Sequence, residues 1–172
     1  MPGLGVTCGT RIALRGKSTE AGDARMANGN QNWQAELRRG WWVEGKTGVD
    51  GQRVMRAELF DPLAKQIADA FGTGLSTSQL RNFYDELKGL DDRVRAYSDE
   101  AEREQAFWAV LPLVKKVKAL ANYAAQKSGS KVPGSFREFL DIGIDQVCDN
   151  HHELHAFVLL FEAVAGFART KS

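Results

Sequence analysis

Residues 76–90, with the sequence STSQLRNFYDELKGL, decide the fold that this 172-residue chain predicts. Ser76 and Gln79 have the spacing of a capping box, in which two side chains satisfy backbone N–H groups at the start of a helix. Apolar residues then recur at helical spacing, at Leu80, Phe83, Tyr84, Leu87 and Leu90. Because these residues fall on one side of a helix, the stretch predicts an amphipathic helix that packs against a core.

Similar signals mark a helix on either side of this one. Upstream, Asp61 and Pro62 read as an N-cap and a first helical residue, and Gly72 stands where that helix should stop. Downstream, Ser98 is expected to cap a long helix whose first turn is acidic, which suits the helix dipole. Pro112 lies inside that long helix and should kink or divide it, because proline lacks a backbone donor and clashes with the preceding turn.

Two further capping signals lie in the last quarter of the sequence. Ser135 with Glu138 has the spacing of a second capping box, and Asn150 with Glu153 resembles a third. These signals predict helices over about 136–148 and 151–169. No segment of the sequence has the alternating pattern of a convincing strand.

The predicted fold is therefore all-α, a compact bundle of about five helices with a Gly-rich N-terminal extension. We place the helical domain at residues 53–172 and the extension at residues 1–52. Ten of the 17 glycines fall within residues 1–51, a composition that favours a flexible or loosely docked arm.

Tryptophans within this extension have two interpretations. Trp33, Leu37 and Trp41 recur at i, i+4 and i+8, so a short amphipathic helix is expected to dock on the body through them. The alternative is that Trp41 and Trp42, which have basic neighbours, stack on unpaired bases. Docking is the favoured interpretation.

Length, net charge and cysteine content limit the class of protein. A chain of 172 residues suits one compact domain, and a net charge of +1 excludes a histone-like polybasic protein. Cys8 and Cys148 stand far apart without a CxxC motif, which fits a reducing compartment, and we expect a cytoplasmic protein. No apolar run approaches the roughly 20 residues that a membrane-spanning helix needs.

Charge is distributed unevenly along the chain. Residues 105–137 contain six basic residues and no Asp or Glu. The six are Lys115, Lys116, Lys118, Lys127, Lys131 and Arg137. Such a window predicts either a surface that meets phosphate, since phosphate contacts need no base identity, or an ordinary solvated helix face.

A helical wheel over residues 111–127 gathers the basic residues on one face. Val114, Val117 and Leu120 form an apolar arc, with Lys118 at its border. The opposite arc holds Lys115, Lys116, Asn122, Tyr123, Gln126 and Lys127. Lysine, amide and phenol groups are suited to phosphate and ribose oxygens, although Tyr123 also fits a half-buried core position.

Three segments resemble a known family. They are LSTSQLR at 75–81, VKALANYAAQK at 117–127 and FEAVAGF at 161–167. In this order they resemble the small subunit of the Csm effector complex of type III-A CRISPR systems, with its L-T-T-S-Q-L-R helix start, its L-x-x-x-Y-A-A-x-R helix and its closing F-E-A-x-x-A-Y. The resemblance spans about residues 55–172.

The resemblance implies an all-helical, non-enzymatic subunit without a cofactor. Such subunits stack in several copies, assemble with other Csm subunits and hold the backbone of the guide RNA and target RNA. Arg81 matches the motif arginine, Lys118 a basic position before the tyrosine, and Lys127 the basic residue after it. Lys115 and Lys116 are added as RNA-binding candidates from the wheel.

The sequence also departs from the family pattern. Asn82 stands where family members often have a further basic residue, and the closing aromatic occurs as Gly166-Phe167. These departures affect the assignment of individual residues more than the resemblance to the family.

A metal site is the first competing interpretation. Cys148, His151 and His155 have a spacing that could place three ligands on one helix face. The metalloprotease pattern H-E-x-x-H fails by one residue, because Glu153 is followed by Leu154 and then His155. We therefore predict ordinary helix-start histidines and no metal.

Enzymatic activity and a protein-only role also compete with RNA binding. The sequence has no P-loop, no GxSxG elbow and no Gly-rich dinucleotide turn, so we predict a protein that is not an enzyme. A helical homodimeric protein–protein interaction module without direct RNA contact remains the alternative function. Its contacts would come from apolar stripes that include Phe107, Trp108, Phe157, Leu160 and Phe161.

Overall fold

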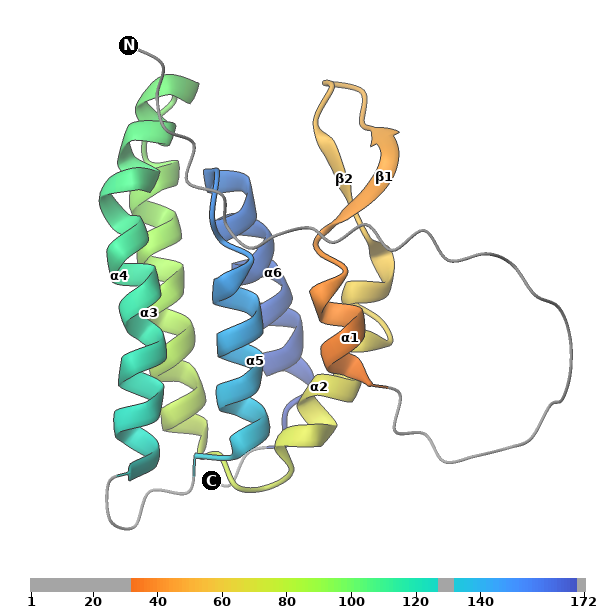
Figure 1. Ribbon diagram of the computed structural model, residues 1–172, viewed down its shortest axis with the longest axis vertical. Coiled ribbons are helices and arrows are strands. Elements are labelled where there is room, and N and C mark those ends of the chain that lie inside the picture. The colour runs from red at the N-terminus through yellow and green to blue at the C-terminus, as the bar shows by residue number, and fades with distance from the viewer. Residues whose placement is uncertain (1–31, 127–131, 170–172) are drawn as a thin grey trace, which may run out of the picture. The chain divides into compact units, whose positions relative to one another are not determined.

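A computed structural model describes residues 32–126 and 132–169 of the chain. Within these ranges it contains six α-helices, one short 3-10 helix and one two-stranded sheet (Figure 1). The elements are α1 Trp33–Arg38, β1 Trp42–Thr47, β2 Arg53–Met55, η1 Ala57–Leu59, α2 Leu63–Phe71, α3 Thr77–Arg95, α4 Glu100–Gln126, α5 Gly134–Asp145 and α6 His151–Phe167. The predicted all-α class is confirmed, and the sheet is a small addition to it.

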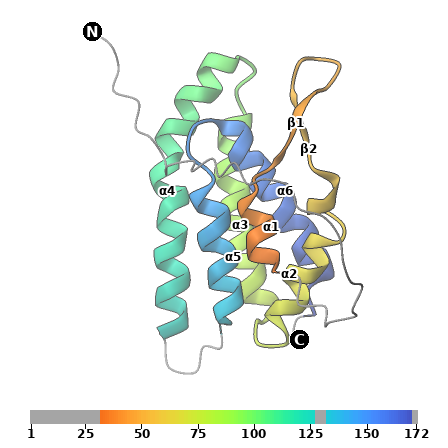
Figure 2. The same cartoon turned by 45° about the vertical axis from the view of Figure 1, so that its right-hand side comes forward.

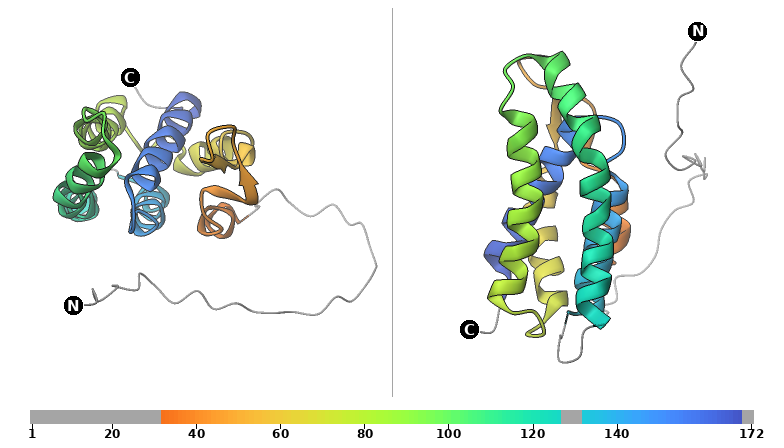
Figure 3. Two further views of the ribbon diagram at one scale, coloured as in Figure 1. Left: turned by 90° about the horizontal axis from the view of Figure 1, so that it is seen from above. Right: turned by 90° about the vertical axis from the view of Figure 1, so that its left-hand side faces the viewer.

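The helices are arranged in three groups across the bundle. Seen from above, α3 and α4 form one edge, α5 and α6 lie in the middle, and α1 and α2 lie on the other side (Figure 3). Contacts join α3 to α4, α4 to α5, and α6 to both α2 and α3. None of the described helices combines the length and the apolar character that crossing a membrane requires.

Phenylalanine rings fill the centre of the bundle. Five of them are fully buried, at Phe107, Phe136, Phe139, Phe157 and Phe161. The rings of Phe139 and Phe161 meet edge to face at 5.3 Å, the arrangement that their quadrupoles favour. This cluster joins α5 to α6 through the contacts of Phe139 with Phe157 and Phe161.

The stretch that predicted the fold forms α3 as expected. The hydroxyl of Ser76 accepts a hydrogen bond from the backbone N–H of Gln79 at 3.2 Å, and the Gln79 side chain accepts from the N–H of Ser76 at 3.1 Å. The predicted capping box is therefore confirmed. Gly72 ends α2 with a φ of 60°, a conformation that glycine adopts without strain.

Two start signals were assigned to the wrong residue or role, and one expected break is absent. Asp99, rather than Ser98, caps α4, because its carboxylate accepts from the N–H groups of Ala101 and Glu102 at 2.9 and 3.1 Å. Pro62 is the N-cap of α2, and Asp61 makes no capping bond there. α4 continues unbroken through Pro112, so the predicted division does not occur.

The two C-terminal helices begin close to the predicted positions. The Asn150 side chain accepts from the N–H of Glu153 at 3.2 Å and caps α6 as predicted. The predicted capping box of Ser135 is wrong, because α5 already begins at Gly134 and the Ser135 hydroxyl donates to the carbonyl of Ala70 at 2.8 Å.

The hairpin β1–β2 was not predicted from the sequence. Its strands pair antiparallel, with Trp42 opposite Met55 and Thr47 opposite Arg53. Gly51 occupies the turn with a φ of 72°, which explains part of the glycine content of this region. The prediction that no segment forms a strand was therefore wrong for residues 42–55.

α1 docks on the body as the tryptophan spacing predicted. Trp33, Leu37 and Trp41 are all buried, and the ring of Trp41 lies 5.9 Å from that of Phe157. The compact unit that contains the bundle begins at residue 31, so α1 and the hairpin belong to it.

The buried Arg56, which follows β2, bonds to residues at the end of α1. The Arg56 guanidinium donates to the carbonyl oxygens of Glu36 and Gly40, both at 3.1 Å, and to the Glu36 carboxylate at 2.9 Å. These bonds satisfy the open C-terminal end of α1 with a charged donor, which is a strong class of hydrogen bond.

Candidate nucleic-acid interface

Lys115, one of the predicted RNA-binding lysines, forms a hydrogen bond within the bundle. Lys115 Nζ donates to the carbonyl oxygen of Ile144, at the end of α5, over 2.7 Å. Its side chain is half-buried, and this burial lowers the pKa of the Lys115 ammonium. The wheel placed Lys115 opposite the apolar arc, but α5 packs against this side of α4, so the Lys115 side chain meets Ile144.

The second lysine at this junction is paired with carboxylates. Lys118 Nζ lies 2.7 Å from Asp145 Oδ1 and 3.7 Å from Asp141 Oδ1, both on α5. Its side chain is 25% exposed, which agrees with its position at the border of the wheel. The window free of acidic residues in sequence is therefore not free of them in space, because a neighbouring helix supplies two.

Two other candidates remain open to solvent. Lys116 on α4 and Arg81 on α3 are exposed, and within residues 32–126 and 132–169 neither makes an ion pair or a side-chain hydrogen bond. The start of α3 and the end of α4 lie at the same end of the bundle (Figures 1 and 3). Lys127 lies outside the described residues.

Exposed apolar side chains surround Lys116 on α4. Trp108, Leu113, Leu120 and Tyr123 are 51, 39, 39 and 71% exposed. Helical spacing puts these four residues and Lys116 on one side of the helix, which we call the α4 outer face. No carboxylate of α4 follows Glu104, so α4 itself contributes an ammonium group and large apolar surface to this face, and no acid.

Two of these residues differ from the sequence prediction. Leu120 was placed on the apolar arc and Trp108 was assigned to an apolar stripe, yet both reach solvent. Exposed Trp and Tyr of this kind are enriched in protein interfaces, where an apolar ring and a polar tip are both useful.

Two histidines and a glutamate form the one group within the described residues that could hold a metal ion. His151 Nε2 lies 2.7 Å and His152 Nε2 3.3 Å from Glu100 Oε1, and the three candidate ligand atoms lie within 4.8 Å of one another. The bond from His151 lowers the pKa of Glu100. Burial, followed by the neighbouring His151, lowers the pKa of His152.

The metal ligands that the sequence spacing suggested are not brought together. His151 turns to Glu100, while His155 Nδ1 lies 2.8 Å from the buried Asp91 carboxylate and its ring also meets Arg95. Cys148 does not join them in the described part of the chain. The grouping of Cys148, His151 and His155 that the spacing allowed is therefore not formed within the described residues.

The described residues define an all-α protein whose candidate site is an exposed helix face. A family model described as Csm2 Type III-A matches residues 55–172, and the chain belongs to this family. It is therefore a small subunit of the Csm complex, a structural component of that assembly. No curated protein and no solved structure matches the chain. The family match leaves α1 and β1 outside it.

Proposed function

We propose that this chain is a non-catalytic, RNA-backbone-binding small subunit that stacks in several copies along guide and target RNA in a type III-A complex. The observation that carries the proposal is the α4 outer face, an exposed helix side with an unpaired ammonium and no carboxylate of its own. A complex that accepts any guide sequence needs contacts to phosphate, because such contacts position the nucleic acid without specifying its bases.

The predicted RNA-binding residues take different roles in this proposal. Arg81 and Lys116 contact phosphates directly, since their charges are exposed and unpaired. Lys127, outside the described residues, remains a predicted RNA-binding residue. Lys115 and Lys118 act mainly by holding α4 on α5, because their ammonium groups already have acceptors there.

A specific observation favours a second candidate function. The four apolar side chains of the α4 outer face suit burial against protein more than contact with phosphate. Burying them between copies of the chain would support stacking along RNA, and would equally support a homodimeric protein–protein module without RNA.

Co-expression of a tagged chain with its neighbouring operon tests the proposal. We expect purification at moderate salt to recover other Csm subunits and repeat-derived guide RNA. Arg81→Ala combined with Lys116→Ala should lower the recovered RNA equally for unrelated guides, while Lys65→Ala, an exposed lysine on α2, should not.

Two outcomes would contradict the proposal. Losses that depend on the guide sequence would argue against backbone contact. A pure homodimer free of RNA would favour the protein-only module, and Tyr123→Ser would then disrupt the dimer.

A further inference from the structure

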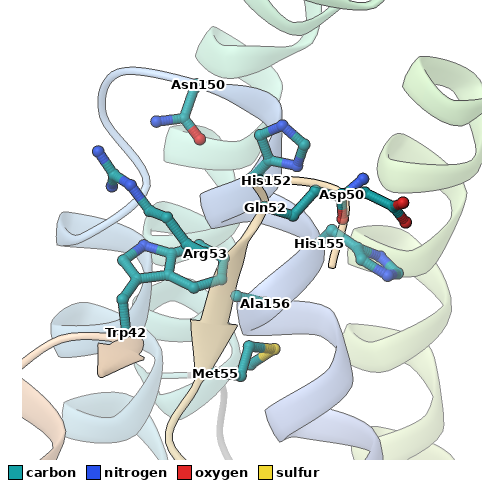
Figure 4. Close-up of a pocket in the computed structure, with 10 residues that line it drawn as sticks. Trp42, Asp50, Gln52, Arg53, Met55, Asn150, His152, His155 and Ala156 are labelled. Carbon is teal, nitrogen blue, oxygen red and sulfur yellow. The ribbon is translucent and has the colours of Figure 1, made fainter. Parts of the chain in front are cut away.

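A cavity of about 500 Å³ lies between the hairpin and the start of α6. Trp42, Gln52 and Arg53 line it from the hairpin, and Asn150, His152 and His155 line it from α6 (Figure 4). The hairpin stands at the end of the bundle where α6 begins (Figures 1 and 2). Cavities of this volume suit small organic ligands and single nucleotides.

We infer that this cavity binds one unpaired nucleotide, with the base against Trp42 and the phosphate toward Arg53. The inference rests on the proposed function, since RNA is the source of nucleotides that the subunit meets. It goes beyond that function because the proposed backbone contacts use α3 and α4. This site is instead built by α6 and by the β1–β2 hairpin, of which only Met55 falls within the family match.

Trp42 supplies the apolar surface that a base needs. Its ring is partly buried and packs on the core, while the neighbouring Trp41 is fully committed to Phe157 and cannot take part. Stacking of a base on an aromatic side chain contributes about 1–3 kcal/mol and tolerates every base. The interpretation of the tryptophans as base platforms therefore applies to one of the two.

Arg53 supplies charge beside this ring. It is exposed on β2, and within the described residues it makes no ion pair. Figure 4 shows its side chain on the same side of the cavity as Trp42. A guanidinium can pair with phosphate through two parallel bonds and can also lie flat on a base, so Arg53 suits either end of a nucleotide.

Polar groups around the cavity suit a nucleoside better than a bare anion. Gln52 offers an amide, and Asn150 keeps its amide N–H groups because its oxygen caps α6. Asp50 also lines the cavity, and a carboxylate would repel a free phosphate but accepts hydrogen bonds from amino and ribose hydroxyl groups. His155 already bonds to the Asp91 carboxylate, so its side chain lines the cavity but is not assigned a contact with the ligand.

The nucleotide should be unpaired, because its base must be free of a duplex to enter the cavity and stack on the Trp42 ring. A base within a duplex has both faces covered by its neighbours, whereas a base in a single strand can enter and stack. The same nucleotide chemistry is available from a free nucleoside monophosphate and from a strand of RNA.

Titration of the full chain with fluorescein-labelled single-stranded RNA tests the inference, with adenosine monophosphate as a second probe and duplex RNA as a third. Trp42→Leu keeps apolar packing but removes the aromatic face, and should weaken single-strand binding about tenfold. Arg53→Gln should reduce the slope of log affinity against log salt by about one. Lys46→Ala, on the same hairpin but outside the cavity, is the matched control.

The outcomes separate this inference from the proposed function. Loss of single-strand binding with unchanged duplex binding supports a site for an unpaired position in RNA, and Trp42-dependent binding of adenosine monophosphate supports the free nucleotide as a ligand. Wild-type binding by both Trp42→Leu and Arg53→Gln, while the Arg81 and Lys116 variant still loses RNA, would overturn the inference alone. Circular dichroism melts establish that each variant is folded.

Discussion

Gly143 on α5 lies directly against the ring of Phe157 on α6. A Cβ at position 143 would stand 2.6 Å from Cζ and 2.7 Å from Cδ2 of that ring, and closer still to Cε2. Phe157 is fully buried and meets Phe139 at 5.5 Å, so it has little room to move. The glycine is therefore required by close packing of the two central helices rather than by its own backbone conformation.

We expect Gly143→Ala to destabilise the fold by about 2–3 kcal/mol, because an added methyl group forces an already dense core apart. Gly89→Ala is the matched control, since Gly89 also lies within a helix but its added Cβ meets open space. The control should stabilise by about 0.5–1 kcal/mol through helix propensity. Urea unfolding measures both, and equal effects would contradict the packing argument.

Adjacent residues at the start of α4 give the second prediction. Asp99→Ala should cost about 1 kcal/mol, because it removes the acceptor for the N–H groups of Ala101 and Glu102. Ser98→Ala should change the free energy of unfolding by less than about 0.5 kcal/mol. The reverse order in a thermal melt would mean that Ser98 caps the helix in solution.

Helices were predictable from the sequence because their signals are local. The Ser76 and Gln79 capping box, the stop at Gly72 and the cap at Asn150 each depend on residues within one turn. The hairpin lacked such a signal: its glycines resemble those of a flexible segment, and its strands are held by contacts with distant helices.

The candidate site was less predictable because it depends on which helix covers which face. Nothing near Lys118 in sequence indicates that Asp145 of α5 will reach it. A wheel extended back to Trp108 would have helped, since Trp108 lies opposite the buried Val117. The cavity beside Trp42 could not be predicted, because its two walls are about 100 residues apart in the chain.

Glu100 gives a prediction of pH dependence. Its folded-state pKa lies below the ordinary 4.5, mainly through the hydrogen bond with His151, so its stabilising contribution is complete above pH 4.5 and is lost as the pH falls through the folded pKa. We expect Glu100→Gln to cost about 0.5 kcal/mol at pH 7, roughly 1–2 °C in melting temperature, because the carboxylate is largely exposed.

A neighbouring glutamate provides the control for that measurement. Glu102 lies in the same first turn of α4 and is exposed, so Glu102→Gln makes the same charge change at the same helix end without breaking the bond to His151. The difference between the two variants should shrink below pH 4.5. A difference that persists to pH 3 would show that packing, rather than charge, accounts for the role of Glu100.

Lys116 and Lys118, two residues apart on α4, should respond differently to the same substitution. Lys118→Ala removes a charge already paired with Asp145, so it should leave the salt dependence of RNA binding unchanged. A double-mutant cycle with Asp145→Ala should give a coupling energy of about 0.2–1 kcal/mol. Lys116→Ala should leave stability within about 0.5 kcal/mol of wild type and flatten the salt slope by about one, since its ammonium is free to meet phosphate. If Lys118→Ala flattened the slope as much as Lys116→Ala, then Lys118 would have to leave Asp145 when RNA binds, and the α4–α5 junction would itself be part of the RNA surface.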